Sequence, residues 1–385
     1  MKKIISKIIA LIMFLVPSAN LPRVNVETSA FKTNYSYIFV HGFSGWGEYN
    51  AINGVYPYWG VKNGDITKYL SARGFDCHAA SVSPTASAWD RACELYAQLT
   101  GTVTDYGEVH SKNCNHKRYG KDYSKKPLIE KWDAESKVNL VGHSFGGATV
   151  RMLAELMANG NEDEVKNGNN VSELFKGGKE SWIYSIITVA SPHNGTSSYN
   201  IQEDLSDDST ATTQEKLIAK VFIGISDLTS GGKKESDTAI YEMQIDNAMK
   251  INKEISTLKN IYYFSFACDS TYLDENGVRQ VDESVLTSKM YITTAKRICS
   301  YKGVTPEGYV IDEKWQANDG LVNTYSEIAP LGAPSVDFDK SNIVPGVWNK
   351  MPIHKGDHTL YQGEMKDYFN ARTFYVDFFS MINAL

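Results

Sequence analysis

Residues 137–151 have the sequence KVNLVGHSFGGATVR, and this stretch decides the fold. Residues 138–141 form a short apolar run that predicts a buried strand, and the apolar spacing of residues 148–157 predicts a helix. The turn between them has the pattern G-x-S-x-G, with Ser144 at its centre. A strand, this turn and a helix in that order form a nucleophile elbow, so we predict that Ser144 is a nucleophile. An ordinary glycine-rich loop is the alternative, but such a loop does not require a serine at its centre.

The glycines beside Ser144 have a physical role in this prediction. A strand that turns directly into a helix leaves no room for Cβ atoms at the positions that flank the serine. The turn lifts the serine hydroxyl above the edge of the sheet, where the helix N-terminus favours negative charge. The pattern therefore predicts an α/β-hydrolase fold, with a mostly parallel sheet and helices on both of its faces.

A second glycine-rich stretch supports the same fold. Residues 35–40 predict the first core strand, and HGFSGWG follows directly at residues 41–47. Such a loop can supply half of an oxyanion hole, the pair of backbone N–H groups that stabilises the negative charge formed in acyl transfer. Phe43 and Phe145 are the expected donors. A glycine-rich loop without this role is the alternative.

The predicted nucleophile needs a base, and three histidines follow the elbow in the chain. In this fold the acid comes after the serine and the histidine comes last. His193 directly follows the predicted strand at residues 182–190, which is too early for the base, and we expect it to stabilise a turn rather than line the pocket. His354 and His358 remain, and His358 lies in the tighter loop before the predicted C-terminal helix at residues 365–382.

Two aspartates compete for the acid that orients this histidine. Asp269 lies just past a predicted late strand at residues 261–267, and Asp319 lies in the sequence NDGLV. The order of the elements favours Asp319 only slightly, so the residues alone leave both aspartates open.

A polar, turn-rich segment carries candidate metal ligands. A helical pattern at residues 88–99 includes Asp90, and the loop after it contains His110 and His116. Zinc binds imidazole nitrogens and carboxylate oxygens, so these three residues could converge on one ion. The spacing is weak evidence, because surface histidines are common, and Cys114 between the histidines is a rival ligand.

Residues 1–30 are predicted to be a secretory signal peptide. Lysines are followed by an apolar core at residues 8–16, which is too short to span a bilayer, and then by small residues. Cleavage after Ala19 or after Ala30 fits this pattern. We expect residues 31–385 to form one exported domain without a transmembrane segment.

Charge and cysteine usage exclude other classes of protein. The formal net charge is −6, and removal of the first nineteen residues leaves −9. A chain this acidic, without a basic stripe, is not expected to bind nucleic acid. The five cysteines are scattered and odd in number, so we expect small buried side chains rather than a disulfide framework.

Residues 196–236 are the least regular part of the chain. Residues 213–228 place apolar side chains on one face of a predicted helix. An amphipathic helix between polar segments, near the predicted active site, is a candidate lid. A helix packed permanently on the core is an equal alternative.

Several stretches together make the chain similar to a known family, the secreted true lipases of the staphylococcal and Geobacillus type (subfamily I.5). The lysine- and asparagine-rich composition is typical of a clostridial member of this group. The matching stretches are HGFSGWG (41–47), YWG (58–60), WDRACELYAQL (89–99), DYGEVH (105–110), HKRYG (116–120), GHSFGG (142–147), SPHNGT (191–196), SDTAIY (236–241), NDGLVNT (318–324), GVWNKM (346–351) and DH (357–358).

The resemblance implies roles for individual residues. Ser144, Asp319 and His358 match the catalytic triad of these lipases, which decides between the two candidate aspartates. Phe43 and Phe145 match the oxyanion positions. The second of these is usually Gln or Met in the family, a change that a backbone N–H donor should tolerate.

The resemblance also implies a structural zinc site. Asp90, His110 and His116 match the zinc ligands of the family, and Asp237 supplies the fourth. Two histidines and two aspartates leave no open coordination position, so the ion would be structural. It would hold an insertion at about residues 85–125 against the segment that follows the candidate lid.

The sequence departs from the family in two places. Family members often bind calcium through acidic residues just after the catalytic histidine, whereas TLYQG follows His358 here, which argues against a calcium site. The segment between Gly195 and Asp237 is shorter than in those lipases. A reduced lid implies weaker interfacial activation and broader acceptance of esters, including insoluble aliphatic polyesters.

The sequence therefore predicts a monomeric secreted triacylglycerol lipase or esterase that acts on ester substrates at a lipid interface through an acyl-enzyme. No organic cofactor is implied. Two rival classes remain: a zinc-dependent hydrolase that uses the predicted metal ligands, and a non-catalytic surface protein built on a hydrolase scaffold.

Overall fold

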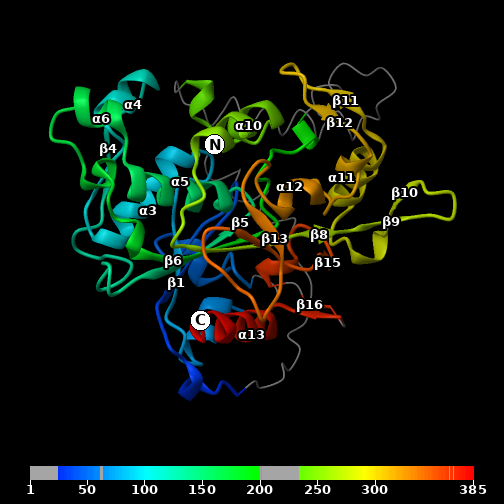
Figure 1. Ribbon diagram of the computed structural model, residues 1–385, viewed down its shortest axis with the longest axis horizontal. Coiled ribbons are helices and arrows are strands. Elements are labelled where there is room, and N and C mark those ends of the chain that lie inside the picture. The colour runs from blue at the N-terminus through cyan, green and yellow to red at the C-terminus, as the bar shows by residue number, and fades with distance from the viewer. Residues whose placement is uncertain (1–24, 61–63, 200, 202–233, 364, 367) are drawn as a thin grey trace.

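A sheet of seven parallel strands forms the centre of the protein (Figure 1). The computed structural model describes residues 25–60, 64–199, 201, 234–363, 365–366 and 368–385. The strands lie in the order β13-β14-β7-β6-β5-β1-β2, so β5, which leads into the elbow, lies inside the sheet. Their bounds are β1 (Ser36–Val40), β2 (Cys77–Ala80), β5 (Val138–His143), β6 (Ile183–Val189), β7 (Tyr262–Phe266), β13 (Ser335–Asp337) and β14 (Trp348–Lys350).

Apolar side chains cover both faces of this sheet. Along β1, Ile38 and Val40 belong to one buried cluster, whereas Tyr37 and Phe39 belong to the other. This alternation follows from the two-residue period of a strand, and burial of both faces explains why the central strands are continuous apolar runs.

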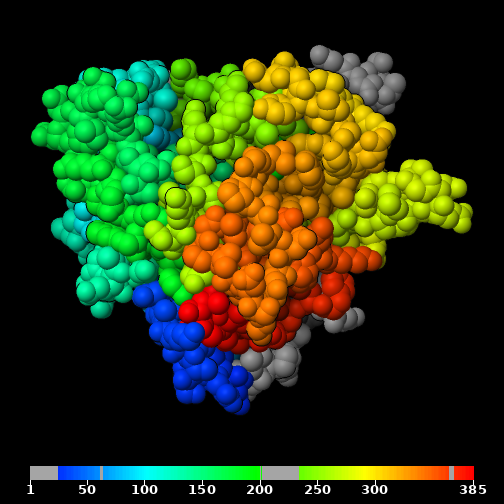
Figure 2. All heavy atoms as spheres, in the orientation of Figure 1, coloured from blue at the N-terminus to red at the C-terminus, as the bar shows by residue number. Residues whose placement is uncertain are grey.

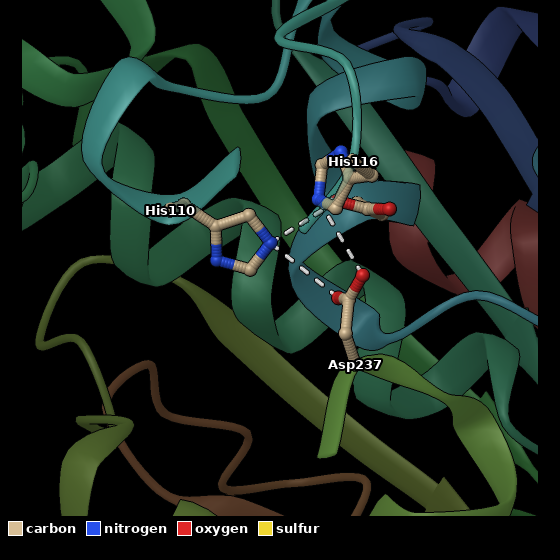
Figure 3. Close-up of side chains that lie close together, drawn as sticks. His110, His116 and Asp237 are labelled. Carbon is tan, nitrogen blue, oxygen red and sulfur yellow. Dashed lines mark ion pairs between the residues drawn. The ribbon is translucent and has the colours of Figure 1, made fainter. Parts of the chain in front are cut away.

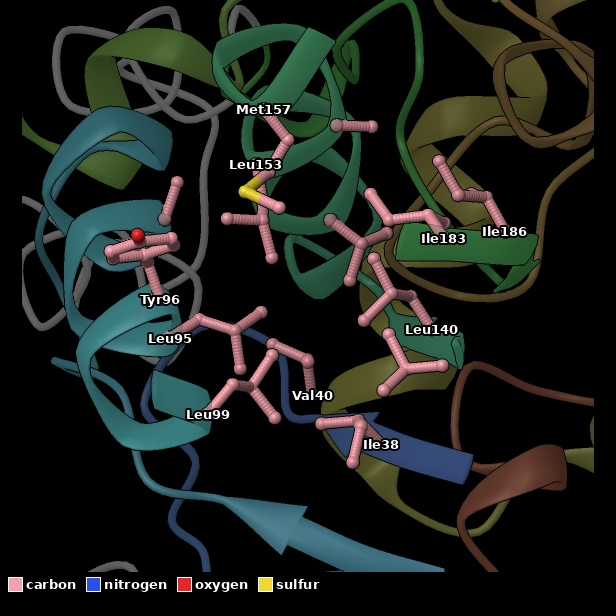
Figure 4. Close-up of a cluster of buried hydrophobic side chains, with 14 of the residues drawn as sticks. Ile38, Val40, Leu95, Tyr96, Leu99, Leu140, Leu153, Met157, Ile183 and Ile186 are labelled. Carbon is pink, nitrogen blue, oxygen red and sulfur yellow. The ribbon is translucent and has the colours of Figure 1, made fainter. Parts of the chain in front are cut away.

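Two long helices cover the first face, α3 (Ala88–Thr100) and α5 (Gly146–Asn159). Leu95 of α3 and Leu153 of α5 are fully buried in the cluster that contains Ile38 (Figure 4). Because α5 begins directly after the elbow, its packing on the sheet holds that turn in place.

The other face is covered by α2 (Ile66–Ser71) and the C-terminal helix α13 (Ala371–Asn383). The ring of Tyr37 stacks on that of Phe379, with 3.7 Å between the ring centroids. The predicted fold class, an α/β-hydrolase with helices on both faces, is therefore confirmed.

The sequence prediction was wrong about two helices. The C-terminal helix begins at Ala371 rather than residue 365, because β16 (Met365–Lys366) pairs with β17 (Phe369–Asn370) in an antiparallel hairpin. The segment around His110 is a short helix, α4 (Glu108–Asn113), rather than a loop. Its first N–H groups donate to the distant Glu164 carboxylate of α6 (Glu162–Asn167), a long-range cap that local sequence cannot reveal.

The remaining elements lie around the sheet. The β9–β10 hairpin projects from the body of the protein and exposes Tyr272, Leu273 and Val278 (Figure 2). Bounds used below or labelled in the figures are β3 (Val103–Asp105), β4 (Tyr119–Asp122), β8 (Cys268–Asp269), β9 (Thr271–Leu273), β10 (Arg279–Val281), β11 (Gly303–Val304), β12 (Val310–Ile311), β15 (His354–Lys355), η5 (Glu235–Asp237), α10 (Ile245–Glu254), α11 (Lys289–Ser300) and α12 (Thr324–Ile328).

Parts of two predictions fall outside the described residues. The predicted signal peptide lies outside them up to residue 24, and so does the predicted lid from residue 202 to residue 233. No helix in the described ranges is long and apolar enough to cross a membrane. All five cysteines are free, and only Cys114 is not buried, in agreement with the sequence analysis.

Candidate active site

The elbow has the strained backbone that its sequence predicts. Ser144 has a φ of 53°, in the left-handed region that non-glycine residues rarely adopt. A Cβ atom on Gly142 would lie 2.6 Å from the carbonyl carbon of Gly146, and one on Gly146 would lie 2.2 Å from the carbonyl oxygen of Val40. Both glycines of G-x-S-x-G are therefore required by close backbone packing, and the strain is stored at the serine.

His358 and Asp319 form a buried pair beside this turn. His358 Nδ1 lies 2.5 Å from Asp319 Oδ2, and the backbone N–H of His358 donates to the Asp319 carbonyl oxygen at 2.9 Å. Asp319 Oδ1 accepts hydrogen bonds from the N–H groups of Leu321 and Val322. Burial alone would raise the pKa of the Asp319 carboxyl, but the His358 charge and these hydrogen bonds hold it below its ordinary value. Asp319 is therefore an ionised acceptor for the imidazole.

A chain of hydrogen bonds joins the elbow to this pair. His143 Nε2 lies 2.8 Å from the carbonyl oxygen of His358, which can only accept, so Nε2 carries the proton. His143 Nδ1 then accepts from the Tyr58 hydroxyl at 2.7 Å, and that oxygen accepts from the N–H of Gly42 at 2.9 Å. One neutral histidine thus ties the elbow to the loop before Phe43 and to the His358 loop. Tyr58 lies in the matched YWG stretch, but no pattern in the sequence indicates this role.

The stability of the protein is expected to fall as the pH decreases from about 6.5 toward 3. Burial lowers the pKa values of His41 and His143 to about 3, with further lowering by the charges of Arg91 and His358 respectively. In this pH range the unfolded chain therefore binds protons at these histidines and the folded chain does not. Each histidine lowers the free energy of unfolding by about 1.4 kcal/mol per unit decrease in pH.

Urea unfolding of the wild type and His143→Gln between pH 7 and pH 4 measures this slope. The Gln side chain can still donate to the His358 carbonyl but cannot titrate, so this variant should lose less stability per pH unit. Equal slopes in the two proteins would contradict the prediction.

The loop that carries Phe43 is held by a buried arginine. The Arg91 guanidinium donates to the carbonyl oxygens of His41 and Gly42, and its Cζ lies 5.1 Å from the centre of the Phe145 ring. Arg91 therefore lies beside both expected oxyanion donors: it binds the two residues before Phe43 and lies over the ring of Phe145. It lies in the matched WDRACELYAQL stretch, but an arginine within a helical pattern gives no local signal of this role.

The rival candidates for the acid and the base are engaged by other partners. The Asp269 carboxylate accepts from the N–H and hydroxyl of Thr271. His354 Nδ1 lies 2.7 Å from the Tyr361 hydroxyl oxygen. His193 is buried, with Nε2 3.0 Å from the Thr188 hydroxyl oxygen, and its backbone N–H donates to the carbonyl oxygen of Ser326, so it holds the turn after β6.

A second cluster unites the four predicted metal ligands. Figure 3 shows three of them, His110, His116 and Asp237, with their side chains pointing toward one another. Asp90 comes from α3, His110 from α4 and Asp237 from η5. His110 Nε2 lies 3.2 Å from Asp90 Oδ1 and 3.4 Å from Asp237 Oδ1, and His116 Nε2 lies 3.4 Å from Asp237 Oδ2. One ligand atom from each of the four residues lies within 4.8 Å of all the others.

The hydrogen bond of His116 fits a cation at the centre of this cluster. His116 Nδ1 lies 2.9 Å from the carbonyl oxygen of Lys117, so Nδ1 carries the proton and Nε2 presents a lone pair to the carboxylates. The Nε2 atoms of His110 and His116 are buried and make no hydrogen bond within the described part of the chain. Cys114 Sγ lies 3.9 Å from His110 Nδ1, on the opposite side of that ring, so it supports a ligand rather than joining the four.

The loop after His358 is tied to the chain by Asp357. Its carboxylate accepts from the Thr287 N–H at 2.7 Å and from the Thr359 N–H and hydroxyl at 2.9 and 2.8 Å. These protein hydrogen bonds engage both oxygens of Asp357, the acidic side chain beside His358.

The sheet, the elbow and the buried His–Asp pair define the class of this protein as an α/β-hydrolase. A family model described as "Lipase-like, C-terminal domain" matches residues 33–214 and 226–384. The chain belongs to this lipase family, and the resemblance inferred from the motifs is confirmed.

Known members of the family are similar along most of the chain. Lipase 2 of Staphylococcus aureus is 32% identical over 364 residues, which cover 86% of this chain and 50% of the relative. The lipase of Staphylococcus hyicus is also 32% identical, with 86% of this chain and 54% of the relative covered. The chain thus spans about half the length of the curated relatives that it matches.

Solved structures match it over nearly their whole length. EstA from Clostridium botulinum has a TM-score of 0.77 at 30% identity, covering 96% of this chain and 92% of that one. The S. hyicus lipase structure has a TM-score of 0.74 at 28% identity, covering 94% and 97%.

Proposed function

We propose that the protein is a secreted carboxylic ester hydrolase of the lipase and esterase type. The observation that carries this proposal is the 2.5 Å contact between His358 Nδ1 and Asp319 Oδ2, beside a serine with a strained backbone. Membership of the lipase family supports the ester as the substrate class. The predicted signal peptide supports export.

In the proposed mechanism the hydroxyl of Ser144 attacks the ester carbonyl. His358 accepts the serine proton at Nε2 and delivers it to the leaving alcohol, which leaves an acyl-enzyme. The same imidazole then activates the water that hydrolyses the acyl-enzyme. Asp319 holds the proton on Nδ1 and so keeps Nε2 free for this transfer. The N–H groups of Phe43 and Phe145 stabilise the negative oxygen in both steps.

The four-residue cluster is proposed to hold a structural zinc ion. Two imidazoles and two carboxylates match the nitrogen and oxygen ligands that zinc prefers, and four protein ligands leave no position for a substrate. The ion would join the segment around Asp90 to the segment that ends in Asp237. It therefore takes no part in the proposed ester chemistry.

The protein is proposed to act as a monomer on insoluble as well as soluble esters. The sequence between Gly195 and Asp237 is short for the family, which reduces the apolar surface that a lid could carry. Initial rates with tributyrin should therefore rise smoothly as its concentration passes the solubility limit, and films of an aliphatic polyester should release soluble acids.

The same assay tests the function itself, with p-nitrophenyl butyrate as the soluble substrate. A protein that folds and binds zinc but hydrolyses none of these esters would contradict the proposed function. A sharp jump in rate at the solubility limit would instead reject only the proposed weak interfacial activation.

A further inference from the structure

A third carboxyl group is buried beside the His358–Asp319 pair. Glu327 of α12 is fully buried, and its Oε2 accepts a hydrogen bond from the backbone N–H of Cys268 at 2.7 Å. Asp319, Glu327 and His358 each offer one atom within 4.8 Å of the other two. The mechanism above uses two of these groups and leaves Glu327 without a role.

The surroundings of Glu327 do not suit a charged carboxylate. Its Oε1 is buried and meets no protein hydrogen-bond donor among the residues that the structure describes. The Glu327 carboxyl offers an oxygen within 4.8 Å of one on the Asp319 carboxylate, which already accepts from Leu321, Val322 and His358. Two buried carboxylates this close together repel each other strongly when both are ionised, so one of them is expected to hold a proton.

The proton belongs on Glu327 rather than on Asp319. Burial and then the negative charge of Asp319 raise the pKa of Glu327 well above its ordinary value, whereas the pKa of Asp319 is lowered. Asp319 has two backbone donors and the imidazole to stabilise its charge, whereas Glu327 has a single backbone donor. The asymmetry of the hydrogen bonds therefore decides which carboxyl is neutral.

We propose that Glu327 is a neutral carboxylic acid whose O–H donates to the Asp319 carboxylate and positions it against His358. This inference rests on the proposed ester hydrolysis, in which Asp319 orients the imidazole. Glu327 is a positioning residue, because it acts on the imidazole only through Asp319. Its side chain also ties α12 to β8 through the Cys268 N–H, so the acid is held between two elements of the scaffold.

Variants of Glu327 separate this role from mere packing. Glu327→Gln keeps a donor of nearly the same shape that cannot ionise, and should retain kcat within about threefold of the wild type. Glu327→Met fills the site without a donor, and should lower kcat by about 10- to 100-fold with little change in KM, as expected when a supporting hydrogen bond is lost.

Thr324→Val is the matched control on the same helix. The Thr324 hydroxyl donates to the Cys268 carbonyl oxygen at 2.6 Å, so its loss weakens the contact of α12 with β8 but leaves Asp319 untouched. This variant should lose stability and keep its kcat. Equal kcat in Glu327→Met and the wild type, or a Glu327→Gln protein as slow as Glu327→Met, would overturn the proposal.

The infrared spectrum provides a readout that does not depend on turnover. At pH 7 the difference spectrum between the Ser144→Ala protein and Ser144→Ala with Glu327→Gln should contain the C=O band of one protonated carboxylic acid. A carboxylate band in its place would overturn the proposal, even if Glu327→Met fails to fold. Because both samples lack the nucleophile, this result is separate from the success or failure of the ester assay.

Discussion

Substitution of Ser144 by alanine is expected to lower kcat/KM for p-nitrophenyl butyrate by about 10⁵-fold or more. The alanine side chain cannot form an acyl-enzyme, and the remaining rate comes only from the oxyanion donors and binding. Alanine has the same Cβ as serine, so the substitution should not add strain at the positive φ of 53°. Steady-state kinetics, with folding checked by thermal unfolding and zinc checked by elemental analysis, measure the effect.

Ser191→Ala is the control for the loss of a hydroxyl near the elbow. The Ser191 hydroxyl donates to the carbonyl oxygen of Gly142 at 3.2 Å, so its loss should cost about 1 kcal/mol of stability while most of the turnover remains. If Ser144→Ala keeps both its zinc and its activity, the elbow is not the catalytic centre. The cluster around Asp90 would then be the place to look for catalysis, as in a zinc-dependent hydrolase.

Removal of the metal is expected to destabilise the folded protein by several kcal/mol. The ligands come from two segments that are distant in the chain, residues 90–116 and Asp237. Because only the folded state brings them together, the ion stabilises that state by its binding free energy. An ion present at about 1,000 times its Kd contributes about 4 kcal/mol. For a chain of this length we expect chelation, or His110→Ala, to lower Tm by on the order of 10 °C.

Two further variants make this experiment specific. His78→Ala removes a histidine from a partly exposed ion pair with Asp76 and should change the stability by less than about 1 kcal/mol. Cys114→Ser should keep one zinc per chain, because Cys114 faces the other nitrogen of His110. A His110→Ala protein with unchanged Tm and one zinc per chain would contradict the proposed site.

Much of the fold could be predicted from local sequence. The strands predicted at residues 35–40, 138–141, 182–190 and 261–267 overlap β1, β5, β6 and β7, with ends within two residues. Strands that are buried on both faces are continuous apolar runs, so they stand out from their neighbours. Helices were less certain where distant groups define their ends, as the Glu164 carboxylate does for α4.

The candidate site could be predicted only in part. The glycines around Ser144 mark the elbow, because the backbone packing leaves no room for a Cβ at Gly142 or at Gly146. The choice between Asp319 and Asp269 came from resemblance to a family, since both follow plausible turns. Glu327 gave no signal in the sequence, because a glutamate in a short helix is ordinarily an exposed residue.

By itself, the sequence determined the elements that depend on neighbouring residues: the apolar strands, the elbow with its serine, and the helix behind it. Resemblance to a family selected Asp319 over Asp269, and the tertiary structure places Asp319 against His358. Only the tertiary structure decided that His143 is neutral between Tyr58 and the His358 carbonyl, and that Glu327 lies beside Asp319. Strand periodicity and turn strain depend on a few neighbouring residues, so they can be predicted from local sequence. A hydrogen bond between side chains depends on where distant segments meet, and the packing of α12 and the His358 loop against the sheet sets that meeting point.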